Sequence, residues 1–185
     1  INLSNHLTTS LGITAQYFTL NKNWTVEPRA ALKWSFNPKH ALALAYGLHS
    51  RREKLDYYFV EQEANGKTES NRYLDFSKAH HFGLTYDWNI NSYMHLKVEP
   101  YYQYLFRIPV EEDSSFSIIN HQSFYLDRIL KNRGSGVNYG IDITLEQYMK
   151  DGFYYMITAS LFKSKYKAGD NIWRNTRLDK NYLLN

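Results

Sequence analysis

The feature of this sequence that most limits its fold is a side-chain alternation with a period of two residues, repeated along almost the whole chain. Apolar side chains take every second position, as they do in a strand whose two faces meet different surroundings. Helical spacing is scarce, so the sequence predicts an all-β fold. The predicted strands are 7–19, 24–36, 42–48, 82–88, 94–106, 137–146 and 153–161, followed by an eighth strand after Trp173, at 176–184.

Strand length and connection length separate this pattern from that of an ordinary β-sandwich. The runs 7–19, 24–36 and 94–106 keep the alternation for 13 residues each. A mean soluble strand has about 5 to 6 residues, whereas a tilted strand across a bilayer needs about 9 to 11. The two long connections, 50–78 and 108–136, would lie at one rim of an up-and-down meander, as in outer-membrane barrels. We therefore predict an antiparallel up-and-down meander of about eight strands, a segment of a transmembrane β-barrel.

Two prolines interrupt this pattern. Pro28 and Pro100 lie inside predicted strands, where a missing N–H normally argues against a central strand. We expect a bulge or a locally missing ladder hydrogen bond at each of them.

Charged residues distinguish the two faces of the predicted strands. In the second, fourth, fifth, sixth and seventh runs, the apolar positions hold no Asp, Glu, Lys or Arg. A charge that faces hydrocarbon near the bilayer midplane costs about 2 to 4 kcal/mol, so a lipid-facing surface excludes charge. A buried sandwich face would exclude it too. The opposite positions of the same runs carry eight charges, which we expect to face the lumen of a barrel: Glu27, Arg29, Lys33, Asp87, Lys97, Glu99, Asp142 and Glu146.

Part of the unusually high tyrosine content, 17 residues, falls on the apolar positions. Together with Trp, these side chains lie mostly near the predicted strand ends. An aromatic ring there can lie at the level of the lipid headgroups with its polar tip in water. The expected membrane-interface aromatics are Trp24, Trp34, Tyr86, Trp88, Tyr102, Tyr104 and Tyr155.

Composition excludes several classes of protein. No stretch approaches the roughly 20 uninterrupted apolar residues of a membrane-spanning helix, so a helical membrane protein is excluded. A chain with 17% aromatic residues is not a disordered tail. Because the chain has no Cys, disulfide scaffolds, thiolate zinc sites and thiol catalysis are excluded as well.

Catalytic, metal and nucleic-acid sites find little support in the sequence. No Ser lies in a nucleophile elbow. His80 and His81 are adjacent in a strand and point to opposite faces, so they cannot hold one metal ion together. The formal charge is +4, yet Arg51-Arg52 is the only short basic cluster. We therefore expect no catalytic residue, cofactor, metal site or nucleic-acid partner.

The long connections are the better candidates for a functional site. Loops of this length are usually functional or disordered. They carry mixed charges and several aromatic residues, and either an extracellular ligand or a plain surface coat would suit that composition. The candidate ligand-binding residues are Arg51, Arg52, Tyr57, Tyr58, Tyr73, Phe116, Phe124 and Tyr125.

Opposite charges two residues apart form a second group of candidates. Glu27 and Arg29, Lys97 and Glu99, and Arg177 and Asp179 should each share one strand face. They would line a lumen that guides solute or holds a plug, or they would be solvated charges that balance each other.

Four segments of the chain resemble a known family. Val26–Trp34 (VEPRAALKW), Ala41–Ser50 (ALALAYGLHS), Asn138–Glu146 (NYGIDITLE) and Arg174–Arg177 (RNTR) are similar to the later barrel strands of TonB-dependent outer-membrane receptors, in the branch common in Bacteroidota. The resemblance implies a C-terminal-half fragment of a 22-stranded barrel in the bacterial outer membrane. It also implies a plug domain and energised uptake of metal chelates, cobalamin, glycans or peptides. The implied partners are outer-membrane lipid, the rest of the barrel and the plug, TonB through an N-terminal part outside this chain, and the extracellular solute.

Both ends of the chain are expected to be interior to a longer protein. The sequence opens at Ile1 without an initiator Met, a basic n-region or an apolar h-region, and 176–185 stops without a turn signal. We expect residues 1–185 to form a single partial β-barrel domain without a plug.

Two other architectures also fit the alternation. A complete small eight-stranded outer-membrane barrel, an adhesin or structural protein, would pair its first strand with its last. A soluble carbohydrate-binding β-sandwich would bury the even positions of 24–36 between two sheets.

Overall fold

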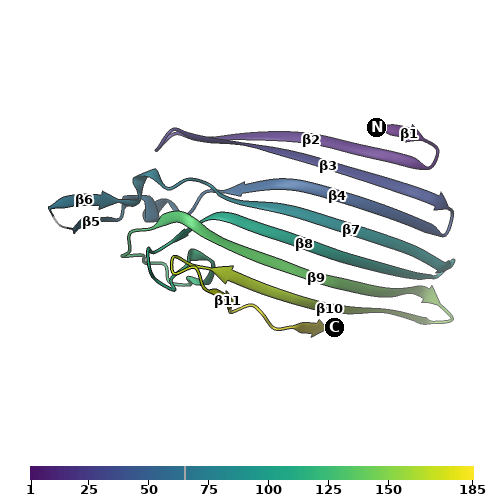
Figure 1. Cartoon of the computed structure of the whole chain (residues 1–185). Helices are drawn as coiled ribbons and strands as arrows, with labels where there is room; N and C mark the ends of the chain where they lie inside the picture. The colour runs from purple at the N-terminus through teal and green to yellow at the C-terminus, as the bar shows by residue number, and fades with distance from the viewer. Residues whose placement is uncertain (65) are drawn as a thin grey trace.

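The chain folds into one long antiparallel sheet with a small hairpin beside it (Figure 1). The computed structural model describes residues 1–64 and 66–185. Nine strands of the main sheet follow one another in the order β1-β2-β3-β4-β7-β8-β9-β10-β11, and β12 also pairs with β10. Their bounds are β1 (Asn2–Ser4), β2 (Leu7–Phe18), β3 (Asn23–Asn37), β4 (His40–Arg51), β7 (Ser77–Asn91), β8 (Met94–Val110), β9 (Lys131–Lys150), β10 (Phe153–Lys167), β11 (Trp173–Asn175) and β12 (Tyr182–Leu184).

The all-β antiparallel meander predicted from the sequence is confirmed, with about ten strands in place of about eight. The hairpin of β5 (Glu61–Ala64) and β6 (Lys67–Ser70) lies in the first long connection and was missed because both of its strands are polar. Short 3-10 helices, η1 (Leu55–Phe59), η2 (Asn71–Tyr73) and η3 (Ile118–Asn120), complete the connections. No helix in the described part of the chain is long and apolar enough to span a membrane.

The prediction of one eighth strand at 176–184 is wrong. The chain pairs with β10 in two short pieces, with Asn175 opposite Lys165 and Tyr182 opposite Leu161. The register therefore shifts by three residues between β11 and β12. The chain between them leaves the ladder. Its ends stay attached to β10 through Thr176 N–H to the Ser164 carbonyl and Phe162 N–H to the Asn181 carbonyl, and its middle through Ser164 N–H to Asp179 Oδ1 (3.2 Å).

The connections divide between two rims of the sheet, as the sequence predicts. Residues 38–39, 92–93 and 151–152 make short turns at one rim, which we call the turn rim. The connections 19–22, 52–76, 111–130 and 168–172 lie at the other, the loop rim. Asp151 (φ 53°) and Gly152 (φ 83°) both have positive φ, as a tight hairpin turn between right-twisted strands requires. In Figure 1 the long connections gather at the left end of the sheet and the short turns at the right end.

Both prolines lie beside gaps in the ladder. Pairing between β3 and β4 stops at Arg29 opposite Gly47, one residue before Pro28, which is paired on its other side with Ile13. The β7–β8 ladder skips the position of Pro100 and resumes on either side of it, while Pro100 keeps its partner on β9. Each missing N–H thus meets an unpaired stretch, which confirms the expected loss of a ladder bond.

The two faces of the sheet differ in chemistry. One, the apolar face, carries the alternating apolar positions and is open to its surroundings. The exposed fractions there are 72% for Leu11, 75% for Ile13 and 68% for Trp24. The other, the polar face, carries the predicted lumen charges. The regular strands extend past the predicted runs, so the apolar face also gains lysines near the loop rim that the sequence analysis did not place there.

The hydrophobic core lies at the loop rim and not between two sheets. It is built from both long connections and from β8, and its buried members are Tyr57, Tyr58, Leu74, Ile108, Ile118, Leu126 and Leu130. Phe18 of β2 packs edge-on against Tyr58, with ring centroids 4.9 Å apart. On the polar face, Ile119 lies against Gly136 of β9. The long loops therefore fold back over the polar face of the sheet.

Hydrogen bonds join the two long loops to each other. The Asn71 side chain is fully buried; its Nδ2 donates to the Arg128 carbonyl (2.8 Å) and its Oδ1 accepts from Leu130 N–H (2.7 Å). Tyr57 donates its hydroxyl proton to the Ser123 carbonyl (3.2 Å). The loops therefore form one packed unit.

Candidate functional site

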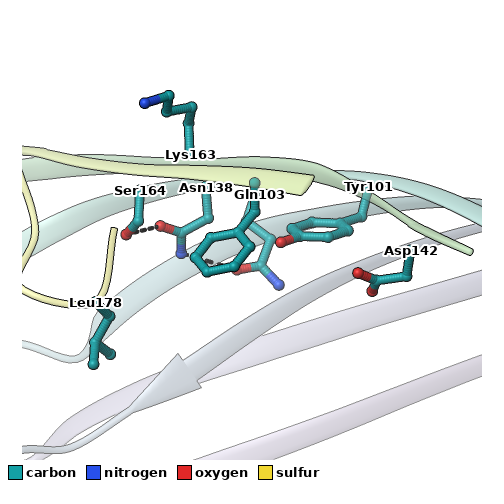
Figure 2. A pocket seen from close by; sticks show the side chains of 8 residues that line it. Tyr101, Gln103, Asn138, Asp142, Lys163, Ser164 and Leu178 are labelled. Atoms are coloured by element: carbon teal, nitrogen blue, oxygen red, sulfur yellow. Dashed lines mark hydrogen bonds between the residues drawn. The ribbon is translucent and has the colours of Figure 1, made fainter. Parts of the chain in front are cut away.

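Below the loops, the polar face of β8, β9 and β10 carries a chain of hydrogen-bonded neutral side chains (Figure 2). Thr176 Oγ1 donates to Ser164 Oγ (2.8 Å), Ser164 Oγ donates to Asn138 Oδ1 (2.6 Å), and Asn138 Nδ2 donates to Gln103 Oε1 (3.1 Å). Every proton in this chain points the same way. The Gln103 amide therefore ends the chain with its N–H groups turned toward the open pocket.

Tyr101 and Asp142 complete a pocket of about 390 Å³ around this end. Figure 2 shows both beside Gln103, while Lys163 points away from the pocket, from the other side of β10. Gly140 makes this arrangement possible, because a Cβ there would lie 2.9 Å from the Tyr101 hydroxyl and 2.5 Å from the Leu161 carbonyl oxygen. Amide donors, a phenol and a carboxylate converge here, which suits a hydrogen-bonding solute.

A second pocket of about 250 Å³ adjoins the first under the second long loop. Asn138 and Ser164 line both pockets, and the loop residues Ile119 to Gln122 form the roof. The Asn120 side chain accepts a hydrogen bond from Arg177 N–H (3.1 Å), which ties the roof to the chain after β11. A solute could thus contact the loops and the strands together.

Among the predicted lumen charges, Glu27 is buried and its partner Arg29 is exposed. Glu27 is only 2% exposed, and its Oε1 accepts hydrogen bonds from Gln16 Nε2 (2.6 Å) and Ser50 N–H (3.0 Å). Arg29 binds the other oxygen at 3.1 Å. The carboxylate therefore joins β2, β3 and β4 at the loop rim.

Further charges on the polar face are also paired. Lys97 lies 2.8 Å from Glu99, and His95 bridges Asp87 (3.1 Å) and Glu146 (4.0 Å). Such part-exposed contacts contribute little stability.

The register places the remaining two predicted lumen charges on the same face. Lys33 lies opposite Thr8 and Ala43, and Asp142 opposite Glu99. The third pair predicted from the sequence does not form, because Asp179 lies 3.8 Å from Lys163 and the chain at Arg177 is not a strand.

The loop candidates divide into buried and exposed residues. Tyr57 (3% exposed) and Tyr58 (1%) are core residues of the loop unit, so they support the loops and cannot meet an external ligand as the sequence analysis expected. Burial also raises the pKa of the Tyr58 phenol above its ordinary value. Tyr73, Phe124 and Tyr125 are largely exposed.

The three remaining loop candidates make short-range contacts. Arg51 lies 3.6 Å from Glu53 and is mostly exposed. Arg52 lies over the Phe18 ring at 5.8 Å. Phe116 is held between Arg128 (4.9 Å) and the His121 ring (5.4 Å).

Ion pairs attach the second loop to the strands beneath it. Glu112 binds Arg133 at 2.6 Å and Lys131 at 3.2 Å, and these cations, Lys131 first, hold the pKa of its carboxyl below the ordinary value. In the last loop, both oxygens of Asp170 bind Arg174, which lowers the pKa of that carboxyl as well.

All seven predicted interface aromatics lie on the apolar face. Trp24 and Trp34 are ten residues apart on β3, and the same face of β7 carries Tyr86 and Trp88. Tyr102 and Tyr104 lie on β8 and Tyr155 on β10. The alternation did not single out His40, which stacks on Trp88 (5.7 Å) and shares a 2.8 Å hydrogen bond with the Tyr86 hydroxyl.

The aromatic positions near the turn rim are staggered from strand to strand. Residues that are paired directly across neighbouring strands form one register row. Trp34 of β3 is in the same row as Tyr86 of β7, and Trp88 lies two residues nearer the turn rim than that row. The row of Trp88 in turn reaches Ile157, and Tyr155 lies two residues nearer the turn rim. This steady offset corresponds to a strand tilt of about 30°, from about 3.4 Å per residue and 4.8 Å between strands. Barrel strands are tilted slightly more, by about 35 to 45°.

Histidines lie on both faces, as predicted for His80 and His81. His80 Nδ1 is 3.0 Å from the Tyr46 hydroxyl on the apolar face, whereas His81 packs against His49 on the polar face, with ring centroids 4.4 Å apart. Among residues 1–64 and 66–185, no group of three or more His, Asp or Glu could hold a metal ion.

The neutral hydrogen-bonded chain is the part of the site that sequence reasoning missed. Alternation places Gln103 and Asn138 on the polar face, but it does not show that they lie opposite each other. The missing signal was the register between β8 and β9, which a 20-residue connection leaves open.

Comparisons with known proteins bear on the fold. The chain matches no family model and no curated protein sequence. Five chains of solved structures are similar to it. One is the FrpB iron transporter from Neisseria meningitidis (F3-3 variant), with a TM-score of 0.54 and 10% identity over 81% of this chain and 21% of that chain. The chain thus spans about a fifth of that protein, and the similarity supports the fold of a β-barrel segment.

Proposed function

We propose that this chain is part of the barrel wall of a TonB-dependent transporter in the bacterial outer membrane, and that the whole protein takes up an extracellular metal chelate, glycan or peptide. The observation that carries the proposal is the two-sided sheet. Its apolar face is uncovered over seven long strands, while its polar face carries paired charges and hydrogen-bonded amides beneath packed loops. Hydrocarbon on one side and a hydrated lumen on the other would satisfy both faces.

The dimensions of the apolar face support this proposal. Trp24 and Trp34 are ten residues apart on β3. At about 3.4 Å per residue and a tilt of about 30 to 40°, they differ in height by about 26 to 29 Å. The apolar band of an outer-membrane barrel is about 25 Å tall and is bordered by aromatic girdles.

In the proposed mechanism, exposed loop residues capture the solute and the polar face guides it. Tyr73, Phe124 and Tyr125 would make the first contacts. The Gln103 amide, the Tyr101 hydroxyl and Asp142 would then exchange hydrogen bonds with the solute below the loops. By the resemblance, TonB in the inner membrane would supply energy through the plug, which lies outside this chain. This role needs no catalytic residue.

Neither alternative architecture has support in the structure. A complete small barrel would pair its first long strand with its last, but β2 and β10 lie near opposite edges of an open sheet in the part described. A sandwich needs a second sheet over the apolar face. The one other sheet among the described residues is the two-stranded β5–β6 hairpin.

Ala30 and Ala31 offer a matched test of which face meets lipid. They are adjacent residues of one size on opposite faces of β3, and the chain has no Cys. Ala30→Cys and Ala31→Cys would be made in the full-length protein and labelled in outer membranes with a membrane-impermeant maleimide. We expect Ala31→Cys to react and Ala30→Cys to be protected. Equal labelling, or the reverse order, would show that the apolar face does not contact lipid.

TonB dependence requires a separate test in cells. A host that produces the full-length protein would receive ferric chelates, glycans or peptides as its sole source of iron or carbon. Growth that needs both the protein and TonB supports the proposal. Growth that continues after TonB is deleted would contradict it.

A further inference from the structure

The apolar face carries charge of one sign only, in a place that solute uptake does not explain. Where the register of the seven long strands is regular, four charged side chains lie on this face, and all are lysines. No Asp or Glu lies on the same stretches of the described strands. The four are Lys78 on β7 and Lys163, Lys165 and Lys167 on β10.

These lysines lie at one level of the sheet. Lys78 is ten residues from Trp88 along β7, and Lys165 is ten residues from Tyr155 along β10. Trp24 and Trp34 show the same interval on β3. Across the paired strands β10, β9, β8 and β7, Lys165 lies level with His80. His80 is two residues nearer the turn rim than Lys78, so Lys165 is offset from Lys78 by the same two residues as Tyr155 is from Trp88. Lys78 and Lys165 therefore stand about 26 to 29 Å above the aromatic level at the turn rim.

Most of this positive charge has no acidic partner. Lys163 Nζ is 3.8 Å from Asp179 and also bonds to Asn181, so its charge is largely balanced. Within the described residues, no carboxylate lies within 4 Å of the Nζ of Lys78, Lys165 or Lys167. Lys167 Nζ instead lies over the Trp173 ring, 6.0 Å from its centroid.

We propose that Lys78, Lys165 and Lys167 bind phosphate groups of lipid headgroups in the leaflet at the loop rim. The inference rests on the proposed function, because it requires lipid against the apolar face. At that level the half-buried lysine stems can pack along acyl chains while the ammonium groups reach the headgroups. Lys165 and Lys167 are two residues apart on one face, about 6.8 Å, so they can contact the same phosphate or two adjacent ones. This surface suits a protein partner less well, because its described strands offer cations but no acidic side chain that could orient the partner.

Full-length protein in detergent would be titrated with dioleoylphosphatidylglycerol, and bound lipid counted by native mass spectrometry. Dioleoylglycerol, which has the same acyl chains without phosphate, is the matched lipid. The variant is K165Q/K167Q. The control, K39Q/K67Q, removes the same charge from the turn rim and from the β5–β6 hairpin. K165R/K167R keeps the charge and tests for rescue.

We expect K165Q/K167Q to bind the phospholipid about 25-fold more weakly, since each lysine near a charged lipid surface contributes about a factor of five. K39Q/K67Q and K165R/K167R should bind like the wild type, and dioleoylglycerol should bind poorly to all. Equal binding by the two glutamine variants would overturn the inference. Full displacement of the lipid by millimolar inorganic phosphate would overturn it too, because the site would then take free anions.

The labelling of β3 separates this inference from the proposed function. If Ala30→Cys is protected and the lysine variants have no effect, the headgroup site is wrong and the barrel wall stands. If Ala30→Cys reacts as readily as Ala31→Cys, the apolar face is not in lipid and both proposals fail.

Discussion

Asn71→Ala should separate the two long loops without unfolding the sheet. The wild-type side chain is fully buried and holds the other loop through its two bonds to Arg128 and Leu130. Alanine leaves the Leu130 N–H and the Arg128 carbonyl without these partners. A lost hydrogen bond costs about 0.5 to 1.5 kcal/mol, and a buried unsatisfied group about 1 to 3 kcal/mol. We expect the free energy of loop opening to fall by about 2 to 4 kcal/mol.

Amide hydrogen exchange measures this directly. A fall of about 2 to 4 kcal/mol should accelerate exchange in 111–130, and at the Leu130 amide itself, by about 30- to 1,000-fold. The ladder amides of β3 and β4 should exchange as before. Asn89→Ala is the control, because Asn89 is exposed at the turn rim and its side chain makes one long 3.5 Å contact. Unchanged protection of Leu130 in Asn71→Ala would refute the interlocked loop unit.

Three further predictions concern the pocket, the loop ion pairs and the apolar face. Gly140→Val should destabilise the protein by about 1 to 3 kcal/mol in urea unfolding and displace Tyr101, because the new side chain meets a fixed carbonyl; an unchanged midpoint would contradict the pocket geometry. Since Lys131 lowers the pKa of Glu112 in the folded protein, this contact is fully present above the ordinary carboxyl pKa and is lost as the pH falls through the lowered value. The protection of the amides in 111–130, relative to their intrinsic exchange rates at each pH, should therefore fall in acid in the wild type, and Glu112→Gln should remove that fall. Dibrominated phospholipid should quench the tryptophan emission of reconstituted full-length protein, and Trp34→Phe should reduce the quenched share; an unreduced share would place Trp34 away from lipid.

The architecture could be predicted because alternation is a local signal. In β3 the position of a residue in the alternation indicates which face its side chain is on. Glu27 and Trp24 could therefore be assigned to opposite faces without any knowledge of the neighbouring strands. Connection lengths then assigned the loops to one rim. This signal failed for β5 and β6, where both faces are polar, and for 176–184, where a local alternation does not reveal that the chain leaves the ladder.

The site was harder to predict because it depends on contacts between distant segments. Tyr57 and Tyr58 lie in a connection whose mixed charges and aromatic residues indicated an exposed loop, but the second loop buries both. The bonds between Gln103, Asn138 and Ser164 require the register of three strands at once. Such contacts are set by tertiary packing and have no local pattern.

The shared core of the long loops has a consequence for loop engineering. Because Tyr58 of one loop and Leu126 of the other belong to the same buried cluster, the loops are not independent cassettes. Replacing 52–76 alone with a foreign segment would expose the apolar underside of 111–130. A change of solute preference by loop exchange would therefore have to move both segments together, along with the residues of β8 on which they rest.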